Sequence, residues 1–308
     1  MPRPPERESA FRISVVIPHL NQAEALDRCL ASLAENSRRA DEIIVVDNGS
    51  VRLPEAVCAR YPGVRLARED APGPGPARNT GVAMASGDVL AFIDADCIAA
   101  PDWIETLADS FARDASAQVL GGAVLVAPAD PGRPTALEAY EMVYSYRMDR
   151  YLRERGFTGA GNMALRRSVW ETVGPFGGIA TAEDMEWCHR ALALGISIVH
   201  VPQMRVWHPA RPGMAELFAK SSRISAQGWT VARGSLRGRA FFAARALAMP
   251  LMPLAELPRL VRTRRLRGLR PRLLAFSVLC RLRFQRAGVM LWLLAGGDGT
   301  RLSGSWNR

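Results

Sequence analysis

The stretch Leu90-Ala91-Phe92-Ile93-Asp94-Ala95-Asp96 is the part of the sequence that decides the fold. Its four apolar residues predict a strand buried on both faces, as in a parallel sheet covered by helices. Because side chains alternate along a strand, Asp94 and Asp96 are expected on one side at its carboxyl end, where open α/β sheets bind ligands. Carboxylates there suit Mg²⁺ or Mn²⁺, and such a cation suits a diphosphate. An acidic pair after an apolar run is also common as a loop or helix cap, so the pair alone leaves both interpretations open.

Strands and helices alternate to either side of this stretch. Apolar runs predict strands, and apolar residues at helical spacing, such as Leu26, Leu30 and Leu33, predict helices. The predicted strands cover residues 11–17, 41–46, 64–68, 89–93, 117–126, 196–200 and 205–207, with one more after a glycine-rich turn within 159–165. The predicted helices cover residues 24–36, 54–61, 77–85, 101–111, 135–154 and 183–194. This alternation indicates an α/β fold with a mostly parallel sheet flanked by helices.

Charge divides the chain into two parts. The 308 residues have a net charge of +10, but residues 1–210 carry 21 basic and 27 acidic side chains, whereas residues 211–308 carry 19 and 3. We expect residues 1–10 to be a disordered tail without the pattern of a secretory signal, residues 11–210 to form the α/β domain, and residues 211–308 to form a helical, arginine-rich C-terminal region. The five cysteines are scattered without a Cys-x-x-Cys pair, which indicates reduced thiols in the cytoplasm.

Five segments together resemble the family 2 glycosyltransferases of the GT-A fold. In chain order they are VVIPHLN at 15–21, EIIVVDNGS at 42–50, GPARNTG at 75–81, ASGDVLAFIDAD at 85–96 and AEDMEW at 182–187. The resemblance covers residues 11–210 and does not extend into the last hundred residues. It implies a Rossmann-like, metal-dependent enzyme that moves a sugar from a nucleotide-diphosphate sugar to an acceptor hydroxyl, with inversion at the anomeric carbon.

The resemblance also implies a nucleotide-sugar-binding side. Asp47 matches the aspartate that the family uses for the nucleotide, and Arg78 matches an arginine near the nucleotide or its phosphates. Asp94 is expected near the ribose or a metal-bound water, and Pro18 and Asn21 belong to the same set. From the residues alone, the sequence DNG at 47–49 is also explained as a turn, and Arg78 as a surface arginine.

The metal and the base follow from the same resemblance. Asp96 is implied as a direct ligand of Mg²⁺ or Mn²⁺, and His208 as a further ligand, although a lone histidine is as often structural. Asp184 is implied as the general base that removes the proton of the acceptor hydroxyl. Acids at the start of a helix also interact favourably with the helix dipole, so Glu183 and Asp184 have a purely structural interpretation as well. The other histidines, at 19, 189 and 200, are expected to be structural.

Four residues are placed on the acceptor side. Glu183 is expected to orient the acceptor or brace its loop, and Gly161 and Asn162 lie in the glycine-rich stretch that the family places beside donor sugar and acceptor. Trp187 is one turn beyond Asp184 and suits stacking on an acceptor sugar, or equally a place in the core. The acceptor is expected to be a glycan or a lipid-linked molecule, such as a lipid-linked or surface-polysaccharide precursor.

Two other classes of protein share some of these features. A nucleotidyltransferase uses a metal and a nucleotide but has no need of the Glu183-Asp184 element. A non-catalytic nucleotide-sugar-binding protein would tolerate loss of Asp184 without a change in behaviour. The sequence does not identify the base, the sugar, the acceptor or the oligomeric state, because loops far apart in the chain form the pocket walls.

Residues 239–295 mix apolar stretches with arginines, seven of them between 259 and 272. We expect none of these stretches to reach the eighteen or so residues of a spanning helix, and we favour helices that lie on an anionic membrane surface. The protein is then cytoplasmic and peripheral on the inner face of the plasma membrane. An ordinary helical subdomain is the alternative, and no nucleic-acid partner is expected because aromatic residues do not interleave with the arginines.

Overall fold

The computed structural model describes residues 11–178, 182–299 and 302. Contacts within the chain divide it into two compact units. One contains the described residues up to 125 together with 146–208, and the other contains residues 126–145 together with those from 209 onward. The expected tail at residues 1–10 lies outside the described residues.

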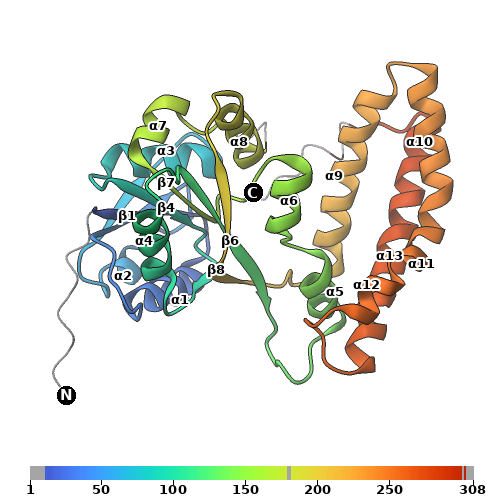
Figure 1. Ribbon diagram of the computed structural model, residues 1–308. Coiled ribbons are helices and arrows are strands. Elements are labelled where there is room, and N and C mark those ends of the chain that lie inside the picture. The colour runs from blue at the N-terminus through green and yellow to red at the C-terminus, as the bar shows by residue number, and fades with distance from the viewer. Residues whose placement is uncertain (1–10, 179–181, 300–301, 303–308) are drawn as a thin grey trace. The chain divides into compact units, whose positions relative to one another are not determined.

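The first unit is built on an eight-stranded sheet in the order β3-β2-β1-β4-β7-β6-β8-β5 (Figure 1). Strands β1, β2, β3 and β4 are parallel, whereas β7 pairs antiparallel with both β4 and β6. The strands are β1 (Ile13–His19), β2 (Glu42–Asp47), β3 (Val64–Arg68), β4 (Val89–Ile93), β5 (Ile98–Ala99), β6 (Val119–Ala127), β7 (Asn162–Arg166) and β8 (Ile198–Pro209). The carboxyl ends of β1, β2 and β4 therefore meet at one edge, as the sequence predicted for an α/β sheet.

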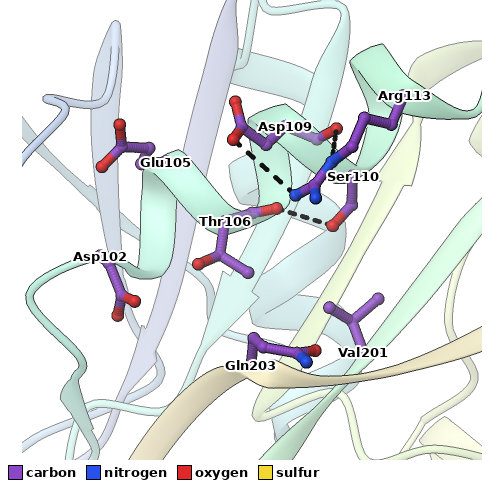
Figure 2. A pocket seen from close by; sticks show the side chains of 8 residues that line it. All are labelled: Asp102, Glu105, Thr106, Asp109, Ser110, Arg113, Val201 and Gln203. Carbon is purple, nitrogen blue, oxygen red and sulfur yellow. Dashed lines mark hydrogen bonds and ion pairs between the residues drawn. The ribbon is translucent and has the colours of Figure 1, made fainter.

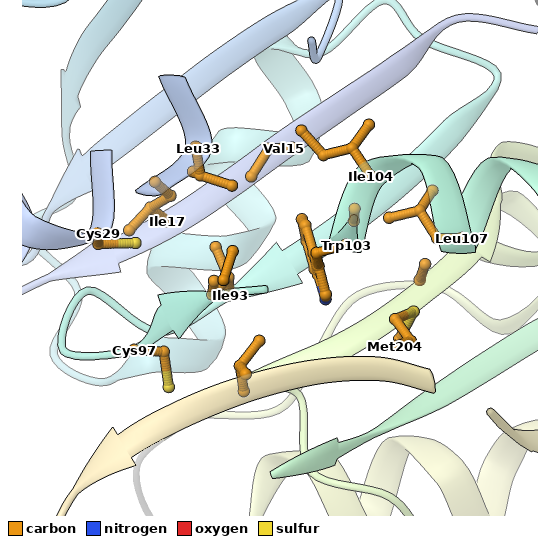
Figure 3. Packing of buried hydrophobic residues seen from close by; sticks show 14 of the residues in the cluster. Val15, Ile17, Cys29, Leu33, Ile93, Cys97, Trp103, Ile104, Leu107 and Met204 are labelled. Atoms are coloured by element: carbon orange, nitrogen blue, oxygen red, sulfur yellow. The ribbon is translucent and has the colours of Figure 1, made fainter. Parts of the chain in front are cut away.

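Helices cover this sheet and bury both of its faces. They are α1 (Ala23–Ala34), α2 (Glu55–Cys58), α3 (Pro74–Met84), α4 (Trp103–Arg113), α6 (Met148–Arg155), α7 (Arg167–Val173) and α8 (Glu183–Ala193). Ala91 and Ile93 of β4 belong to one apolar cluster, shown in part in Figure 3, while Leu90 and Phe92 belong to another. All of β4 is buried. The apolar run at 90–93 is thus a central strand packed on both faces, which confirms the prediction.

Two predicted elements differ from the structure. The helix expected over residues 135–154 is interrupted, because α5 (Ala136–Tyr144) ends before Tyr146, which has a left-handed backbone (φ 50°). The two short strands expected at 196–200 and 205–207 are one continuous strand, β8. The short elements α7 and β5 were not predicted.

The second unit is helical. Besides α5 it contains α9 (Met214–Ala232), α10 (Leu236–Ala248), a 3₁₀ turn (Met249–Leu251), α11 (Met252–Ala255), α12 (Leu257–Arg262) and α13 (Leu269–Leu294). Residues 126–145 were assigned to the catalytic domain from sequence, but α5 packs on α13 through Ala139, Tyr140 and Val143. Buried Glu141 also pairs with Arg211, which follows β8. The apolar face of α5 is buried in the helical unit. The contacts therefore assign residues 126–145 to this unit and not to a continuous domain that ends at residue 210.

One segment of the described chain, Leu236–Arg262, is long and apolar enough to cross a membrane by length and composition, and most of its apolar window is exposed. The expectation that no apolar stretch reaches this length was therefore wrong. Within this segment Arg245 lies in α10, Pro250 lies in the 3₁₀ turn and Pro253 lies in the first turn of α11, so the helical path passes both prolines.

Candidate active site

The candidate site begins at the carboxyl ends of β1 and β2. Asp47 ends β2, and its Oδ1 lies 2.9 Å from His19 Nδ1 at the end of β1. Its Oδ2 accepts hydrogen bonds from the backbone N–H groups of Gly49 and Ser50. Burial alone would raise the pKa of Asp47, but the hydrogen bonds from Ser50 and His19 outweigh it and hold the pKa below its usual range.

These contacts determine what Asp47 can do in this conformation. The side chains of Asp47 and His19 have no exposed surface, so Asp47 braces the turn after β2, and His19 is structural as predicted. Asn21 is exposed, has a left-handed backbone (φ 54°) and accepts a hydrogen bond from the N–H of Val51. Pro18 is half-buried within β1. The DNG turn and the 18–21 turn are therefore fastened together at this edge of the sheet.

Arg78 joins the end of β4 to the start of α8, which begins 105 residues after Arg78 in the chain. Its Nη2 donates to Asp94 Oδ1 at 2.7 Å, and its Nη1 donates to Glu183 Oε1 at 2.9 Å. The Arg78 side chain is 4 % exposed, and its guanidinium carbon lies 5.8 Å from the centroid of the Phe176 ring. Arg78 is thus a buried connector between the end of β4 and the start of α8, and the surface-arginine interpretation was wrong.

Glycines allow these side chains to approach one another. A Cβ on Gly161 would lie 2.2 Å from Asp94 Oδ2, so any side chain there would displace the carboxylate. A Cβ on Gly75, in the first turn of α3, would lie 2.1 Å from the carbonyl oxygen of Gly177. Close packing therefore requires glycine at positions 75 and 161.

Asp96 forms a second group with His208 and Tyr146. Asp96 Oδ2 lies 3.4 Å from His208 Nε2, and the Tyr146 hydroxyl lies 3.2 Å from a ring nitrogen of His208. Asp96 Oδ1 is buried without a hydrogen-bond partner. Burial raises the pKa of Asp96, which the His208 charge opposes and the Asp94 charge reinforces. Tyr146 was not predicted from the sequence, because a single tyrosine in a helix-like pattern has no motif; its left-handed backbone is visible only in the structure.

Asp184 lies at the start of α8 beside Glu183. Its Oδ1 accepts a hydrogen bond from the N–H of Met185, and its Oδ2 faces Gly159. Burial raises the pKa of Asp184, and the charge of Glu183 raises it further, while Arg78 lowers it only in part. A helix-start acid that merely answers the helix dipole is expected to be solvated and to have a lowered pKa. The environment of Asp184 is the opposite, which is typical of a functional carboxylate.

Two residues predicted on the acceptor side are instead structural. The Asn162 side chain is fully buried and joins three elements by accepting from Trp103 Nε1 and donating to the carbonyl oxygens of Ala123 and Met204. Trp187 is fully buried and donates from Nε1 to the carbonyl oxygen of Gly174. Both side chains point into the core because β7 and α8 direct these positions away from Asp94 and Asp184.

Two further observations concern a metal cluster and a hollow outside the candidate site. Among the residues that the structure describes, no three His, Cys, Asp or Glu side chains converge as a ready-made metal site. A separate hollow of about 430 Å³ lies between α4 and β8, and Figure 2 shows the side chains that line it: Asp102, Glu105, Thr106, Asp109, Ser110, Arg113, Val201 and Gln203. None of the residues discussed above lines this hollow.

Comparison with known proteins establishes the family. The model of glycosyl transferase family 2 matches residues 14–174, which is more than half of the chain. The chain belongs to glycosyltransferase family 2. Glycosyltransferase AglE of Haloferax volcanii is 31 % identical over 236 residues, covering 73 % of this chain and 76 % of that protein. The pre-mycofactocin glycosyltransferase of Mycobacterium tuberculosis is 30 % identical and matches 72 % of this chain but only 47 % of its own length.

Solved structures share the fold. A mannosyltransferase from Pyrobaculum calidifontis, in complex with GDP-Man and Mn²⁺, superposes with a TM-score of 0.58 at 17 % identity, covering 94 % of this chain and 88 % of that one. Glucosyl-3-phosphoglycerate synthase of M. tuberculosis, in complex with Mn²⁺ and UDP, superposes with a TM-score of 0.51 at 24 % identity, covering 70 % and 78 %. The fold of this family 2 enzyme is GT-A, as the sequence predicted.

Proposed function

We propose that this glycosyltransferase transfers a sugar from a nucleotide-diphosphate sugar to an acceptor hydroxyl with inversion, using Asp184 as the general base. The observation that carries the proposal is the chain of contacts from Asp94 through Arg78 to Glu183, which holds the half-buried carboxylate of Asp184 near the end of β4. Asp184 makes no ion pair among the described residues, which supports its role as the base.

The residues present fit a divalent cation. Asp96 offers a buried oxygen without a partner, and His208 offers a ring nitrogen beside the other oxygen. These two residues would hold Mg²⁺ or Mn²⁺, with substrate phosphates and water completing the shell. The solved mannosyltransferase and the glucosyl-3-phosphoglycerate synthase carry such ions. The metal, when bound, would neutralise the negative charge of the departing diphosphate.

The donor side follows from the turns at the sheet edge. Asp47 positions the turn after β2, and Asn21 and Pro18 form the neighbouring turn, so the nucleotide would lie against backbone that these contacts hold in place. Arg78 holds Asp94 in place through one ion pair. Because its other terminal nitrogen pairs with Glu183, both ends of the guanidinium are occupied by carboxylates. Asp94 is the more exposed partner, which leaves it accessible to a ribose hydroxyl or a metal-bound water.

The chemical step uses Asp184 on the acceptor side. The acceptor oxygen forms a bond to the anomeric carbon while the bond from that carbon to the diphosphate oxygen breaks. The hydroxyl proton moves to Asp184, and the nucleoside diphosphate leaves with the electron pair. A raised pKa makes Asp184 a stronger base than a solvated aspartate, which favours this proton transfer. Gly161 lets the Asp94 carboxylate approach the backbone closely, and Glu183 orients the loop through Arg78.

We propose a lipid-linked or surface-polysaccharide precursor as the acceptor, at the cytoplasmic face of the plasma membrane. Support comes from the arginine-rich second unit and from one relative, the glucosyl-dolichyl phosphate glucuronosyltransferase of H. volcanii, which is 33 % identical over 108 residues. That name describes the relative's lipid-phosphate substrate.

A thermal-shift panel of nucleotide sugars with Mn²⁺ would identify the donor, because a bound ligand stabilises the folded state. With that donor and a simple acceptor, the enzyme should release a nucleoside diphosphate and give a product of inverted anomeric configuration by NMR. The Asp184→Asn variant should keep donor binding and lose at least about 100-fold in turnover. Asp109→Asn on α4 is the matched control, since Asp109 pairs only with Arg113 at the surface.

Each alternative predicts a different result. Release of pyrophosphate instead of a nucleoside diphosphate would indicate a nucleotidyltransferase. Donor binding with no turnover for any acceptor, and no effect of Asp184→Asn, would indicate a binding protein. A product with retained configuration would contradict the base assignment.

A further inference from the structure

We propose that residues 247–273, here called the lipid-facing segment, lie on an anionic lipid surface without crossing it. The segment contains the end of α10, the 3₁₀ turn, α11, α12 and the start of α13, which pack side by side (orange to red in Figure 1). This inference is independent of the proposed sugar transfer, because it concerns only the second unit.

The lipid-facing segment exposes an unusual amount of apolar surface. Most of the large hydrophobic side chains that are exposed in the described residues belong to the second unit, and many belong to this segment. Leu251 and Val261 are each 68 % exposed, and Leu269 is 69 % exposed. The full set within the segment is Leu247, Leu251, Met252, Leu254, Leu257, Val261, Leu269 and Leu273. So many large apolar side chains exposed within one segment indicate a protein or membrane contact.

The arginines of the segment divide into two groups. Arg259, Arg265 and Arg272 donate to backbone carbonyl oxygens of Val143, Met142 and Leu260, so they hold the turn between α12 and α13 in place. The second group is exposed and has no hydrogen bond or ion pair among the described contacts: Arg262, Arg264, Arg267 and Arg270. The sequence suggested that seven arginines anchor the protein, but the structure leaves four for an external partner.

The positive charge of the lipid-facing segment favours an anionic lipid surface over a second copy of the chain. Glu256 is the only acid in the segment, and it already pairs with Arg259. A second copy of the chain would bring four further exposed arginines against these four, which is repulsive. Anionic lipid headgroups complement the arginines, and the interleaved leucines can enter the boundary of the acyl chains.

The surface arrangement, rather than a transmembrane one, follows from the arginines of α13. Arg283 Nη1 lies 3.7 Å from Met249 Sδ, at the middle of the apolar segment Leu236–Arg262. Arg286 lies near both Arg245 and Arg283, and burial together with these two charges lowers its pKa to about 10. A spanning orientation would bring this arginine cluster to the centre of the bilayer, where each charge is costly. Lying on the surface keeps this cluster away from the centre of the bilayer.

Co-sedimentation of the full-length protein with vesicles tests the proposal. Vesicles of phosphatidylglycerol and phosphatidylcholine should pellet the protein at low salt, and pure phosphatidylcholine vesicles should do so far less. Replacing Arg262, Arg264, Arg267 and Arg270 by Gln should lower the partition coefficient by roughly 100- to 1,000-fold at low salt. Replacing Leu251, Leu254 and Val261 by Gln should lower it at both low and high salt, because apolar burial is not screened.

Matched controls come from the first unit. Replacing the exposed residues Arg28, Arg39, Arg52 and Arg153 by Gln removes the same charge, and replacing Leu194 and Val199 by Gln removes exposed apolar surface elsewhere. Circular dichroism of every variant confirms that the helices form. The proposal is overturned if the wild-type protein stays in the supernatant with anionic vesicles. It is also overturned if target and control variants bind equally, if alkaline carbonate fails to extract the protein, or if the leucine variants abolish a dimer and leave lipid binding intact.

Discussion

Replacing Arg78 should weaken the connection between β4 and α8 more than any exposed ion pair of the chain could. The guanidinium makes two hydrogen-bonded ion pairs through different nitrogens, at 2.7 Å to Asp94 and 2.9 Å to Glu183. Only a planar fork can make both at once, so Arg78→Lys keeps the charge and loses one contact. Arg78→Met keeps most of the volume and loses both.

The loss of stability from breaking each ion pair depends on how far its two side chains are exposed to water. The side chain of Glu183 is 13 % exposed and that of Arg78 is 4 % exposed, so this pair is shielded from water. The side chain of Asp94 is 37 % exposed, and water can replace its lost partner more easily. Breaking a buried pair by removing one partner costs about 3–5 kcal/mol, and we expect Arg78→Met to lower the free energy of unfolding by this amount. Arg78→Lys should lower it by about 1.5–3 kcal/mol.

Urea unfolding followed by circular dichroism measures both variants, and a double-mutant cycle isolates the Arg78–Glu183 pair. Combining Arg78→Met with Glu183→Gln should give a coupling energy of about 2 kcal/mol. The control cycle uses Arg190→Met with Glu186→Gln, a pair in the same helix whose side chains are 35 % and 37 % exposed, for which about 0.5 kcal/mol or less is expected. Equal coupling in the two cycles, or an Arg78→Met variant within about 1 kcal/mol of the wild type, would refute the reasoning from burial.

Three further predictions concern the site. Burial and the charge of Glu183 raise the pKa of Asp184, and the base must be ionised, so activity is lost as the pH falls through that pKa. The Glu183→Gln variant removes one cause of the raised pKa and should move the acidic limb of the kcat/KM profile to lower pH. A shift of this limb to higher pH would contradict the coupling between the two carboxylates. Tyr146→Phe removes the hydroxyl beside His208 and should weaken Mn²⁺ binding in calorimetry about 10-fold, with unchanged unfolding in urea; equal Mn²⁺ affinity would rule out a positioning role. Asn162→Ala leaves an indole N–H and two carbonyl oxygens unpaired in the core and should cost about 2–4 kcal/mol in urea unfolding, whereas a cost below about 1 kcal/mol would show that water replaces the amide.

The sequence by itself determined the class of fold and the position of Asp94 and Asp96 just after a buried strand. The run Leu90–Asp96 predicts a doubly covered strand with acids at its carboxyl end, because apolar residues in succession need burial on both faces and charged residues need an edge. Strand residues 64–68 and 89–93 were predicted without error for the same reason. The local sequence pattern is sufficient to predict an element where the neighbours in the chain determine each residue's environment.

Only the tertiary structure decided which side chains meet. Asn162 and Trp187 have residue types that suit a sugar site, but the direction of β7 and α8 sends them into the core. Tyr146 interrupts a helix-like pattern because it is held against His208, 62 residues away. The connection of Asp94 to Glu183 through Arg78 depends on three separate elements converging. These outcomes depend on contacts between residues distant in sequence, and no local periodicity encodes such contacts.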